Sequence, residues 1–410
     1  MRISRKKFKI TQALILCGGR GSRLGHLTKN NPKPLLKVSN KIFLDYIIHN
    51  LIRHGIKSIF LLCGYKYKKI YKKYHNKVFL GIKIKCLKEN FFLGTGGAIV
   101  NANKILEKKF IVCNGDTYFN FNLLDFINNY KEKFNACLAT TTFKKKKIRY
   151  GKVKATKGRV ISLGKNLNSN YINTGYYIFS KKDFVRLKKK FISLEEEILS
   201  ELIKKKKLQA INFNHKNNFF LDIGLPKDFF IAQKKIPKQY IKRAVFLDRD
   251  GVINKDLGYV IKKKDFYWNK GVKEGIKLLN QNNFYVFVIT NQSGIGRGYY
   301  SEKKLIKLHE WINNELSLIG AHIDAFFYAP YFKFSNKLRY RKSKNLRKPN
   351  TGMIEMAKKE WPIDLKNSIL IGDQLSDIQV AKKAKIKESY LFKKNYNFLR
   401  LIKKILPKKT

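Results

Sequence analysis

The chain has 410 residues, enough for two or three domains, and 44% of them are hydrophobic, as is usual for globular proteins. Its formal net charge of +60 is unusual and would allow binding to nucleic acid or to an anionic membrane. The lysines, however, are spread through the chain between apolar residues, and no recognised nucleic-acid-binding module occurs. We therefore interpret the charge as a drift in composition and expect no specific nucleic-acid partner. No stretch approaches the ~20 apolar residues of a membrane span.

The first predicted strand covers residues 13–17 and leads into a glycine-rich turn, 18–21. The basic residues before this strand imitate a signal peptide, but the apolar run is too short and ends in the turn. Glycines let backbone N–H groups approach a phosphate closely, because no side chain intervenes. A lone glycine-rich turn is weak evidence, so the rest of the pattern decides its meaning.

Helix and strand patterns alternate after this turn. Residues 42–54 have the pattern of a helix that ends at Gly55, and residues 58–63 have that of a strand. The alternation predicts an α/β fold with a parallel, doubly wound sheet. The cysteines are odd in number and form no Cys-x-x-Cys pair, which predicts buried, reduced thiols in a cytoplasmic protein. They are Cys17, Cys63, Cys86, Cys113 and Cys137.

The first half carries five further motifs in a fixed order, at 32–36, 93–98, 113–116, 173–176 and 219–224. Together with the glycine-rich turn and the basic residues within it, this set resembles the sugar-1-phosphate nucleotidyltransferases over about residues 11–235. The resemblance implies that Arg23 grips the departing phosphates and that Lys33 contacts the α-phosphate. It implies that Asp116 and Asp222 hold Mg²⁺. The substrate-binding residues that it implies are Gly18, Gly19, Gly21, Gly94, Thr95, Gly96, Gly97, Lys165, Asn173 and Gly175.

One position departs from that family. Gly164 stands where many relatives have a glutamate that binds sugar hydroxyls, directly before Lys165. The identity of the sugar therefore stays open. Lysine is so common here that a solvated surface charge is the plain alternative for Lys33 and Lys165, and only their places in the motifs favour a role.

The second half contains Asp248 and Asp250 at the end of an apolar run, 245–247. Residues i and i+2 of a strand point the same way, so both carboxylates would project together. Two carboxylates this close repel unless a cation lies between them, which predicts Mg²⁺. One of them could attack an electrophile while the other handles the proton. The plain alternative is a strand followed by an Asp-Gly turn.

Two more apolar runs, 285–289 and 368–371, also end in polar residues, and Lys348 lies between them. Ligands of open parallel sheets bind at the carboxyl ends of the strands. This arrangement resembles the haloacid-dehalogenase-like phosphatases over about residues 243–392. The resemblance implies Asp248 as nucleophile, Asp250 as general acid and base, and Lys348 as the neutralising cation. The implied phosphate- and substrate-binding residues are Thr290, Asn291, Gln292, Ser293, Arg297 and Arg347.

The same resemblance implies that Mg²⁺ is held by Asp248, Asp373 and the backbone carbonyl of Asp250, while Asp377 orients this set. Residues 290–299 and 308–311 are more specifically similar to heptose 1,7-bisphosphate phosphatases, with histidinol-phosphate phosphatases as near relatives. Those phosphatases usually carry a zinc-binding loop. Here the corresponding stretches, 329–332 and 344–349, contain no cysteine or histidine, so no zinc site is expected. We expect the basic loop between them to shape the substrate entrance without a metal.

These patterns predict two doubly wound, Rossmann-like α/β domains. The boundaries are a nucleotidyltransferase domain at 1–235, a linker at 236–242, a phosphatase domain at 243–392 and a basic tail at 393–410. The linker is polar, basic and contains Pro237. The tail fits a packing helix with a frayed basic end better than an amphipathic helix on a membrane surface.

The two resemblances together predict an enzyme that makes a nucleotide-activated heptose from phosphosugars and a nucleoside triphosphate, with GTP favoured. Three alternatives remain. The first domain could use another sugar 1-phosphate or nucleotide, and the second could hydrolyse histidinol phosphate or another small phosphomonoester. The chain could also be an eroded enzyme that binds polyanions, which the intact set of acidic residues argues against. Whether the protein forms an oligomer stays open.

Overall fold

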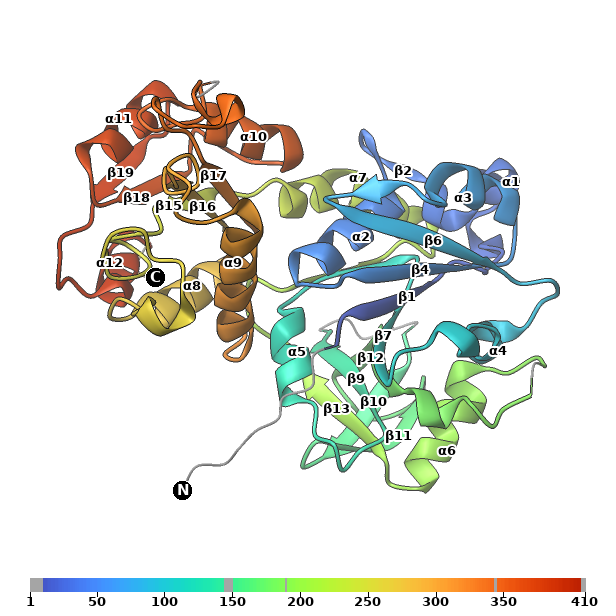
Figure 1. The fold of residues 1–410 in the computed structure, drawn as a ribbon. Coiled ribbons are helices and arrows are strands. Elements are labelled where there is room, and N and C mark those ends of the chain that lie inside the picture. The colour runs from blue at the N-terminus through green and yellow to red at the C-terminus, as the bar shows by residue number, and fades with distance from the viewer. Residues whose placement is uncertain (1–9, 144–149, 189, 343–344, 407–410) are drawn as a thin grey trace. The chain divides into compact units, whose positions relative to one another are not determined.

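The computed structural model describes residues 10–143, 150–188, 190–342 and 345–406. The chain divides into two compact units, Met1–Gln239 and Tyr240–Thr410, which are described separately. Figure 1 shows their elements. The described helices include none that is both long and apolar enough to cross a membrane.

The first unit combines a large mixed sheet with two short two-stranded ladders. Its strands are β1 (Gln12–Leu16), β2 (Lys37–Val38), β3 (Lys41–Ile42), β4 (Ser58–Cys63), β5 (Val78–Phe79), β6 (Ile82–Lys88), β7 (Lys109–Asn114), β8 (Thr117–Asn120), β9 (Ala136–Thr142), β10 (Lys152–Thr156), β11 (Arg159–Gly164), β12 (Tyr171–Ser180), β13 (Leu208–Asn212) and β14 (Phe219–Asp222). Its α-helices are α1 (His26–Asn30), α2 (Phe43–Arg53), α3 (Tyr67–Tyr74), α4 (Gly94–Asn101), α5 (Leu123–Asn129), α6 (Ser200–Lys204) and α7 (Pro226–Tyr240).

The large sheet has the strand order β10-β11-β13-β9-β12-β7-β1-β4-β6-β5. Strands β1, β4, β6 and β7 pair in parallel, as predicted from the alternating pattern. The predicted parallel arrangement does not extend to the whole sheet, because β12 runs antiparallel to both β7 and β9. Between β9 and β12 the chain forms only the two strands β10 and β11. A β12 strand that ran parallel to β9 would have needed a long crossover connection between them.

The predicted helix over 42–54 and strand over 58–63 correspond to α2 and β4. The helix ends where expected, since Gly55 follows its cap with a φ of 86° that disfavours other residues. On one face of the sheet, α4 and α6 pack against Leu14, Val112 and Leu138, whose side chains are buried. The β1–β4–β6–β7 half therefore brings the ends of its strands, and the loops after them, to one edge.

The second unit has a five-stranded sheet in the order β17-β16-β15-β18-β19, with every neighbouring pair parallel. Its strands are β15 (Ala244–Leu247), β16 (Tyr285–Asn291), β17 (Ala325–Ala329), β18 (Ile369–Gly372) and β19 (Glu388–Leu391). Its helices are α8 (Val272–Gln281), α9 (Glu302–Ser317), α10 (Gly352–Glu360), α11 (Leu375–Lys383) and α12 (Phe398–Ile405).

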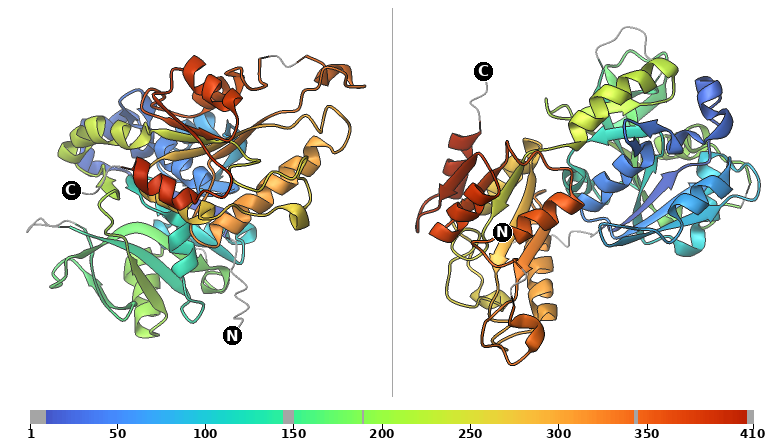
Figure 2. Two further views of the ribbon diagram at one scale, coloured as in Figure 1. Left: turned by 90° about the vertical axis from the view of Figure 1, so that its left-hand side faces the viewer. Right: turned by 90° about the horizontal axis from the view of Figure 1, so that it is seen from above.

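Helices cover both faces of this sheet, as Figures 1 and 2 show. One face packs with α8, α9 and α12 around Val245, Leu247 and Val288. Helices α10 and α11 lie over the other face, where Phe246, Phe287 and Trp361 gather. The sheet is therefore doubly wound, and both units are mixed α/β folds.

The two units divide after Gln239, inside the predicted linker, but the structure differs from two details of the predicted boundaries. Helix α7 continues through the predicted linker and Pro237 as far as Tyr240. Its residues Phe229, Ala232, Ile236 and Tyr240 recur at helical spacing and are all buried. Burial of this apolar stripe outweighs the hydrogen bond that a proline removes from a helix interior.

The predicted basic tail at 393–410 contains a helix, α12. Helix α12 buries Phe398, Leu401 and Ile402 in the core of the second unit, so the domain extends past the predicted end at residue 392. This confirms the packing-helix interpretation for the described part. Residues 407–410, like the basic segment 1–9, lie outside the described residues.

Candidate functional sites

A cavity of about 370 Å³ opens at the carboxyl edge of the second sheet. Strand β15 ends one residue before Asp248, and both Asp248 and Asp250 line the cavity as the i, i+2 spacing predicts. The other predicted residues in the lining come from β16, β18 and the loop before α10: Thr290, Asn291, Gln292, Lys348 and Asp373. Ser293, Arg297 and Arg347 lie outside the lining.

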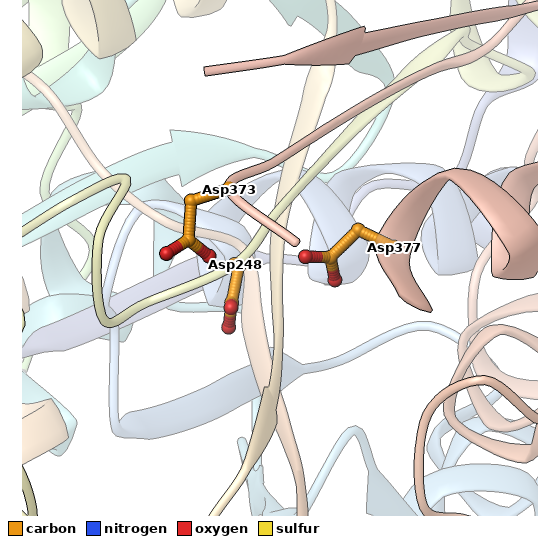
Figure 3. A group of neighbouring side chains, drawn as sticks. All are labelled: Asp248, Asp373 and Asp377. Carbon is orange, nitrogen blue, oxygen red and sulfur yellow. The ribbon is translucent and has the colours of Figure 1, made fainter. Parts of the chain in front are cut away.

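Three carboxylates converge in this cavity. Oxygens of Asp248, Asp373 and Asp377 lie within 4.8 Å of one another, and Figure 3 shows their side chains approaching from the ends of β15 and β18 and from α11. Burial, with the charges of Asp377 and Asp250, raises the pKa of Asp248 to about 7, although Lys348 opposes the shift. Burial likewise raises the pKa of Asp373. Lys348 therefore offsets only part of the repulsion between these carboxylates, and a further cation would stabilise the cluster.

The donor set fits a hard divalent cation such as Mg²⁺. Its atoms are carboxylate oxygens, which this ion prefers. The buried Oδ1 atom of Asp373 has no hydrogen-bond partner in the described part of the chain, as expected of an atom reserved for a ligand. A metal ion could be shared by three or more His, Cys, Asp or Glu side chains that lie close together. Among the described residues, the side chains that meet this condition are Asp248, Asp373 and Asp377.

Lys348 is the cation within this cluster. Its Nζ atom lies 2.9 Å from Asp248 Oδ1 and 2.6 Å from Asp377 Oδ1, and its side chain is buried. Burial alone would lower the pKa of Lys348, but the two aspartates outweigh it and raise the pKa. Asn291 holds the same segment, since its Oδ1 accepts a 3.0 Å hydrogen bond from the backbone N–H of Lys348. The segment can thus place a positive charge beside Asp248.

Gly251 makes the close approach of the two loops possible. Its φ is +88°, and a Cβ atom there would lie 2.1 Å from Asp373 Oδ2. We predict that Gly251→Ala displaces Asp373 and lowers Mg²⁺-dependent phosphate release by about 100-fold, the scale of a lost charge-stabilising group. Titration of phosphate release with Mg²⁺ measures this effect. Gly298→Ala is the matched control, because Gly298 has a similar φ of +84° with open space around it; equal losses in both variants would contradict the prediction.

Asp250 is held by a set of donors that the motif alone did not reveal. Arg249, which is fully buried, donates from Nη2 to both carboxylate oxygens at 2.9 and 2.8 Å. Asn254 adds a hydrogen bond of 3.0 Å and Gln292 one of 2.9 Å. Arg249 stands between the two aspartates in the sequence. Successive side chains of a strand point to opposite faces, so Arg249 is expected to point away from the aspartates and into the core. A buried charge there needs a partner, which is the clue that could have revealed this pair.

Gln292 holds other groups in place. Its Nε2 atom donates to Asp250 and to Thr290 Oγ1, and its Oε1 atom accepts a 2.6 Å hydrogen bond from Tyr300. Both amide hydrogens are therefore used within the protein. The Gln292 side chain thus holds Asp250 and Thr290 in place, and its contact with substrate stays a prediction.

A second cavity, of about 280 Å³, lies in the first unit beside the glycine-rich turn. Predicted residues that line it are Gly18, Gly19, Gly21, Lys33, Gly94, Thr95 and Asp116. Those outside its lining are Arg23, Gly96, Gly97, Lys165, Asn173, Gly175 and Asp222. The turn and three of the later motifs, at 32–36, 93–98 and 113–116, therefore meet, although they are far apart in the sequence.

The two predicted metal carboxylates of this unit lie close together. Asp116 follows β7, and Asp222 ends β14, which pairs with β8 so that Asp222 faces Thr117. The Thr117 hydroxyl lies 3.2 Å from a carboxylate oxygen of each aspartate. Lys33 Nζ approaches Asp116 Oδ2 at 2.5 Å. A carboxylate pair with a neighbouring lysine can hold a divalent cation and an anionic group together.

The glycines at the start of α4 pack closely against the loop that contains Ile192. Gly96 and Gly97 N–H groups both donate to the carbonyl of Ile192, at 2.9 and 3.2 Å. A Cβ atom at Gly94 would lie 2.6 Å from the same carbonyl oxygen. Gly94 and Thr95 line the cavity, whereas Gly96 and Gly97 donate to a neighbouring loop, and contact between these four residues and substrate stays a prediction.

Two of the residues predicted to face the sugar, Asn173 and Lys165, interact with a glutamate that the motifs did not include. Asn173 Nδ2 lies 3.4 Å from Glu195 Oε1. Burial and the charge of Glu196 raise the pKa of Glu195, although the charge of Lys165 opposes the shift. Gly175 has a φ of 75° and lies against Asn114. Glu195 thus offers a carboxylate near Lys165, although the preceding residue, Gly164, has none.

Comparisons with known proteins decide the family. The nucleotidyl transferase family model matches residues 12–239, more than half of the chain. The chain belongs to the nucleotidyl transferase family. Of the curated relatives of this nucleotidyl transferase domain, a D-glycero-alpha-D-manno-heptose 1-phosphate guanylyltransferase of Campylobacter jejuni is 39% identical over 53% of this chain and 97% of its own length. A crystal structure of HddC from Yersinia pseudotuberculosis superposes with a TM-score of 0.50 and 31% identity, covering 55% of this chain and all of that one.

The nucleotidyl transferase domain is followed by a phosphatase domain. Residues 244–397 match the model described as polynucleotide kinase 3 phosphatase. A D-glycero-alpha-D-manno-heptose-1,7-bisphosphate 7-phosphatase of Photorhabdus laumondii is 41% identical over 37% of this chain and 82% of its own length. The chain is therefore an enzyme with a nucleotidyltransferase domain and a phosphatase domain, as the motifs predicted.

Two further side chains line the nucleotidyl transferase cavity and were missed in the sequence. They are Glu89 and Phe92, which stand just before the predicted motif at 93–98. A Cβ atom at Gly18 would lie 2.7 Å from Glu89 Oε1, so this carboxylate packs against the glycine-rich turn. Its place directly after a strand of the parallel half was the clue that could have revealed it.

Proposed function

We propose that the chain makes GDP-heptose in two steps. The phosphatase domain removes the 7-phosphate of D-glycero-D-manno-heptose 1,7-bisphosphate, and the nucleotidyl transferase domain then transfers GMP from GTP to the heptose 1-phosphate. The observation that carries the proposal is that relatives of the two domains are named for consecutive substrates, because removal of the 7-phosphate leaves a 1-phosphate. We also assign the protein to the cytoplasm, which the buried, unpaired cysteines support.

In the phosphatase domain, an oxygen of Asp248 attacks phosphorus and the bond to the sugar oxygen breaks. Asp250 gives its proton to that leaving oxygen. Water then attacks the aspartyl phosphate while Asp250 takes the water proton, and phosphate leaves. The 2.9 Å contact between Lys348 and Asp248 supports a role for this lysine in neutralising the phosphoryl group. Thr290 and Asn291, which line the cavity, bind its oxygens.

Asp248, Asp373 and the Asp250 carbonyl would hold Mg²⁺, with Asp377 beside them. Bound there, the ion would offset the negative charge of the phosphoryl group and of the carboxylates. The convergence of these carboxylates in one cavity supports this choice.

In the nucleotidyl transferase domain, a phosphate oxygen of the sugar 1-phosphate attacks the α-phosphorus of the nucleotide, and the bond to pyrophosphate breaks. This chemistry depends on positioning and charge neutralisation. Lys33 contacts the α-phosphate, Arg23 holds the departing phosphates, and Asp116 and Asp222 would hold Mg²⁺. The cavity beside the glycine-rich turn, with Lys33 and Asp116 in its walls, supports the arrangement. Lys165 meets the sugar phosphate.

Glu89 supports guanine as the base. A carboxylate offers two acceptor oxygens and no donor. Guanine presents two adjacent donors, N1–H and the 2-amino group, and so complements this edge. Adenine and cytosine each place an acceptor beside their amino group, and uracil and thymine present one N–H between two carbonyls. Burial raises the pKa of Glu89, and the N–H of Leu93 opposes the shift.

We predict that Glu89→Gln lowers kcat/KM for GTP by about 10-fold or more, the scale of a lost hydrogen bond to a charged group. Inosine triphosphate, which lacks the 2-amino group, should lose less. The release of pyrophosphate with each nucleotide measures the difference. Glu107→Gln is the control, because Glu107 is exposed and bonds to Thr11. An equal loss for both nucleotides would refute the role in base recognition.

The whole proposal is tested by supplying heptose 1,7-bisphosphate, Mg²⁺ and each nucleoside triphosphate singly, with products followed by mass spectrometry. GDP-heptose with both phosphate and pyrophosphate is the expected result. Release of phosphate without formation of a nucleotide sugar would indicate that the first domain uses another sugar 1-phosphate or another nucleotide. If the second domain hydrolyses histidinol phosphate in preference to heptose 1,7-bisphosphate, histidinol phosphate becomes its assigned substrate. An absence of both activities, with tight and salt-sensitive binding of nucleic acid, would favour the polyanion-binding alternative.

A further inference from the structure

One loop lines the phosphatase cavity through Gln292 and Tyr300, and a glutamate ties it to a second loop. The first loop follows β16 and leads into α9, whose first residue is Glu302. The second follows β17, where Tyr328 lies in register with Thr290 of the neighbouring strand. Glu302 accepts hydrogen bonds from Tyr328 at 2.6 Å and from Tyr340 at 2.5 Å. We call Glu302, Tyr328 and Tyr340 the tyrosine–glutamate hub.

The hub is built into the core beside the cavity. Tyr340 is 5% exposed and packs with Ile295, Tyr300 and Leu305. Burial on its own would raise the pKa of Glu302, but the two tyrosine hydroxyls and Arg339 outweigh it and lower the pKa. Hydrogen bonds to a charged carboxylate are stronger than those between neutral groups. The hub is therefore a firm link between the two loops.

The hub closes the second loop onto the first. The N–H of Phe332 donates to the carbonyl of Tyr340 at 2.9 Å, so the loop returns on itself. A Cβ atom at Gly296 would lie 2.7 Å from Pro330 O and 2.9 Å from Phe332, so only a glycine permits this approach. The next residue, Arg297, lies over the ring of Phe332, with its guanidinium carbon 3.8 Å from the ring centroid.

Stacking leaves the donor edge of Arg297 available. In the described part of the chain, this guanidinium has no carboxylate within ion-pair distance, and the residue is exposed. A stacked guanidinium is held in one plane and presents its N–H groups as a fork that matches phosphate. The cavity already provides Asp248, Thr290 and Lys348 for the phosphate that reacts, so a fork on its bordering loop suits a second one.

We propose that the tyrosine–glutamate hub positions Arg297, through Phe332, to bind the second phosphate of a bisphosphorylated substrate. Arg297 touches the substrate, whereas Glu302, Tyr328 and Tyr340 are positioning residues that act through the loop. The proposal rests on the proposed function, because it takes a sugar bisphosphate as the substrate of the phosphatase domain.

The test compares two substrates, heptose 1,7-bisphosphate and p-nitrophenyl phosphate, which has no second phosphate. Tyr340→Phe removes one hydroxyl of the hub and keeps the buried ring. It should lower kcat/KM for the bisphosphate by about 10-fold, through a higher KM, and change p-nitrophenyl phosphate turnover by less than about twofold. Arg297→Ala should have the same signature, and the double variant should lose little more than Arg297→Ala alone.

Tyr390→Phe is the matched control. Tyr390 also donates to a glutamate, Glu388 at 2.7 Å, but this pair lies on β19 at the other edge of the sheet. The Tyr390→Phe variant should prefer heptose 1,7-bisphosphate over p-nitrophenyl phosphate to the same extent as the unmodified protein. Retained turnover of p-nitrophenyl phosphate shows in each variant that the domain is folded. If Tyr340→Phe abolishes it, Tyr328→Phe, which removes the other hydroxyl, takes its place.

Three outcomes are distinct. Loss of the preference in Tyr340→Phe and Arg297→Ala, but not in Tyr390→Phe, supports the proposal. An unmodified protein that prefers the bisphosphate, with hub variants that keep this preference, overturns the positioning role and leaves the proposed function intact. An unmodified protein with no preference for the bisphosphate overturns both.

Discussion

Asp248→Asn is expected to lower phosphate release by about 10⁴-fold or more, because an amide cannot act as the attacking nucleophile and such losses are typical of a removed nucleophile. The fold should survive the change. Lys348 keeps its contact with Asp377 at 2.6 Å, so no buried charge loses its partner. The measurement is phosphate release from heptose 1,7-bisphosphate in the presence of Mg²⁺.

The other domain serves as the internal control for this variant. Pyrophosphate release from GTP and supplied heptose 1-phosphate should remain within about twofold of the unmodified protein, since Asp248 belongs to a separate compact unit. Retention of phosphatase activity in Asp248→Asn would show that another group attacks the phosphate. A loss of both activities in a folded protein would refute two independent sites.

Asp116→Asn should have the opposite result, with pyrophosphate release lowered by about 100-fold or more and phosphate release unchanged. The substitution removes the negative charge that would hold Mg²⁺, and loss of such electrostatic stabilisation is worth about 10²–10³ in rate. It also removes the charge opposite Lys33, which approaches Asp116 at 2.5 Å. Pyrophosphate release over a range of Mg²⁺ concentrations measures the effect.

Two observations separate a metal role for Asp116 from a role in holding Lys33. A variant impaired through the metal should need more Mg²⁺ for half-maximal activity, whereas one impaired through Lys33 should show an unchanged Mg²⁺ requirement and a higher KM for GTP. Asp222→Asn is the companion variant, because the Asp222 carboxylate shares the Thr117 contact. An unchanged Mg²⁺ requirement in both variants would refute the carboxylate pair as a metal site.

The sequence was most informative where chemistry follows directly from local pattern. Apolar runs that end in polar residues located the strand ends at Asp248, Thr290 and Asp373, and all three line one cavity. The prediction follows from topology, because the carboxyl ends of parallel strands meet at one edge of the sheet. The glycine-rich turn and Lys33 likewise meet in the first unit, although 12 positions or more separate them.

The sequence was least informative about side chains whose partners come from other segments. Gln292 resembled a substrate contact, yet its amide is used by Asp250, Thr290 and Tyr300. Gly96 and Gly97 had the pattern of a ligand loop, yet both donate to Ile192, almost 100 residues away. Asp250 and Ile192 lie far along the chain from the residues that donate to them, so no local pattern could identify these two partners.

The amino-acid sequence by itself determined the order of the motifs, the division into two α/β domains and the carboxylates and lysines available for catalysis, because these depend on residue type and short-range spacing. Only the tertiary structure decided that α7 continues through Pro237, that β12 runs antiparallel and that Gln292 donates to Asp250. These features depend on packing between distant segments. Burial of an apolar stripe or a charged group there outweighs the local preference of the chain.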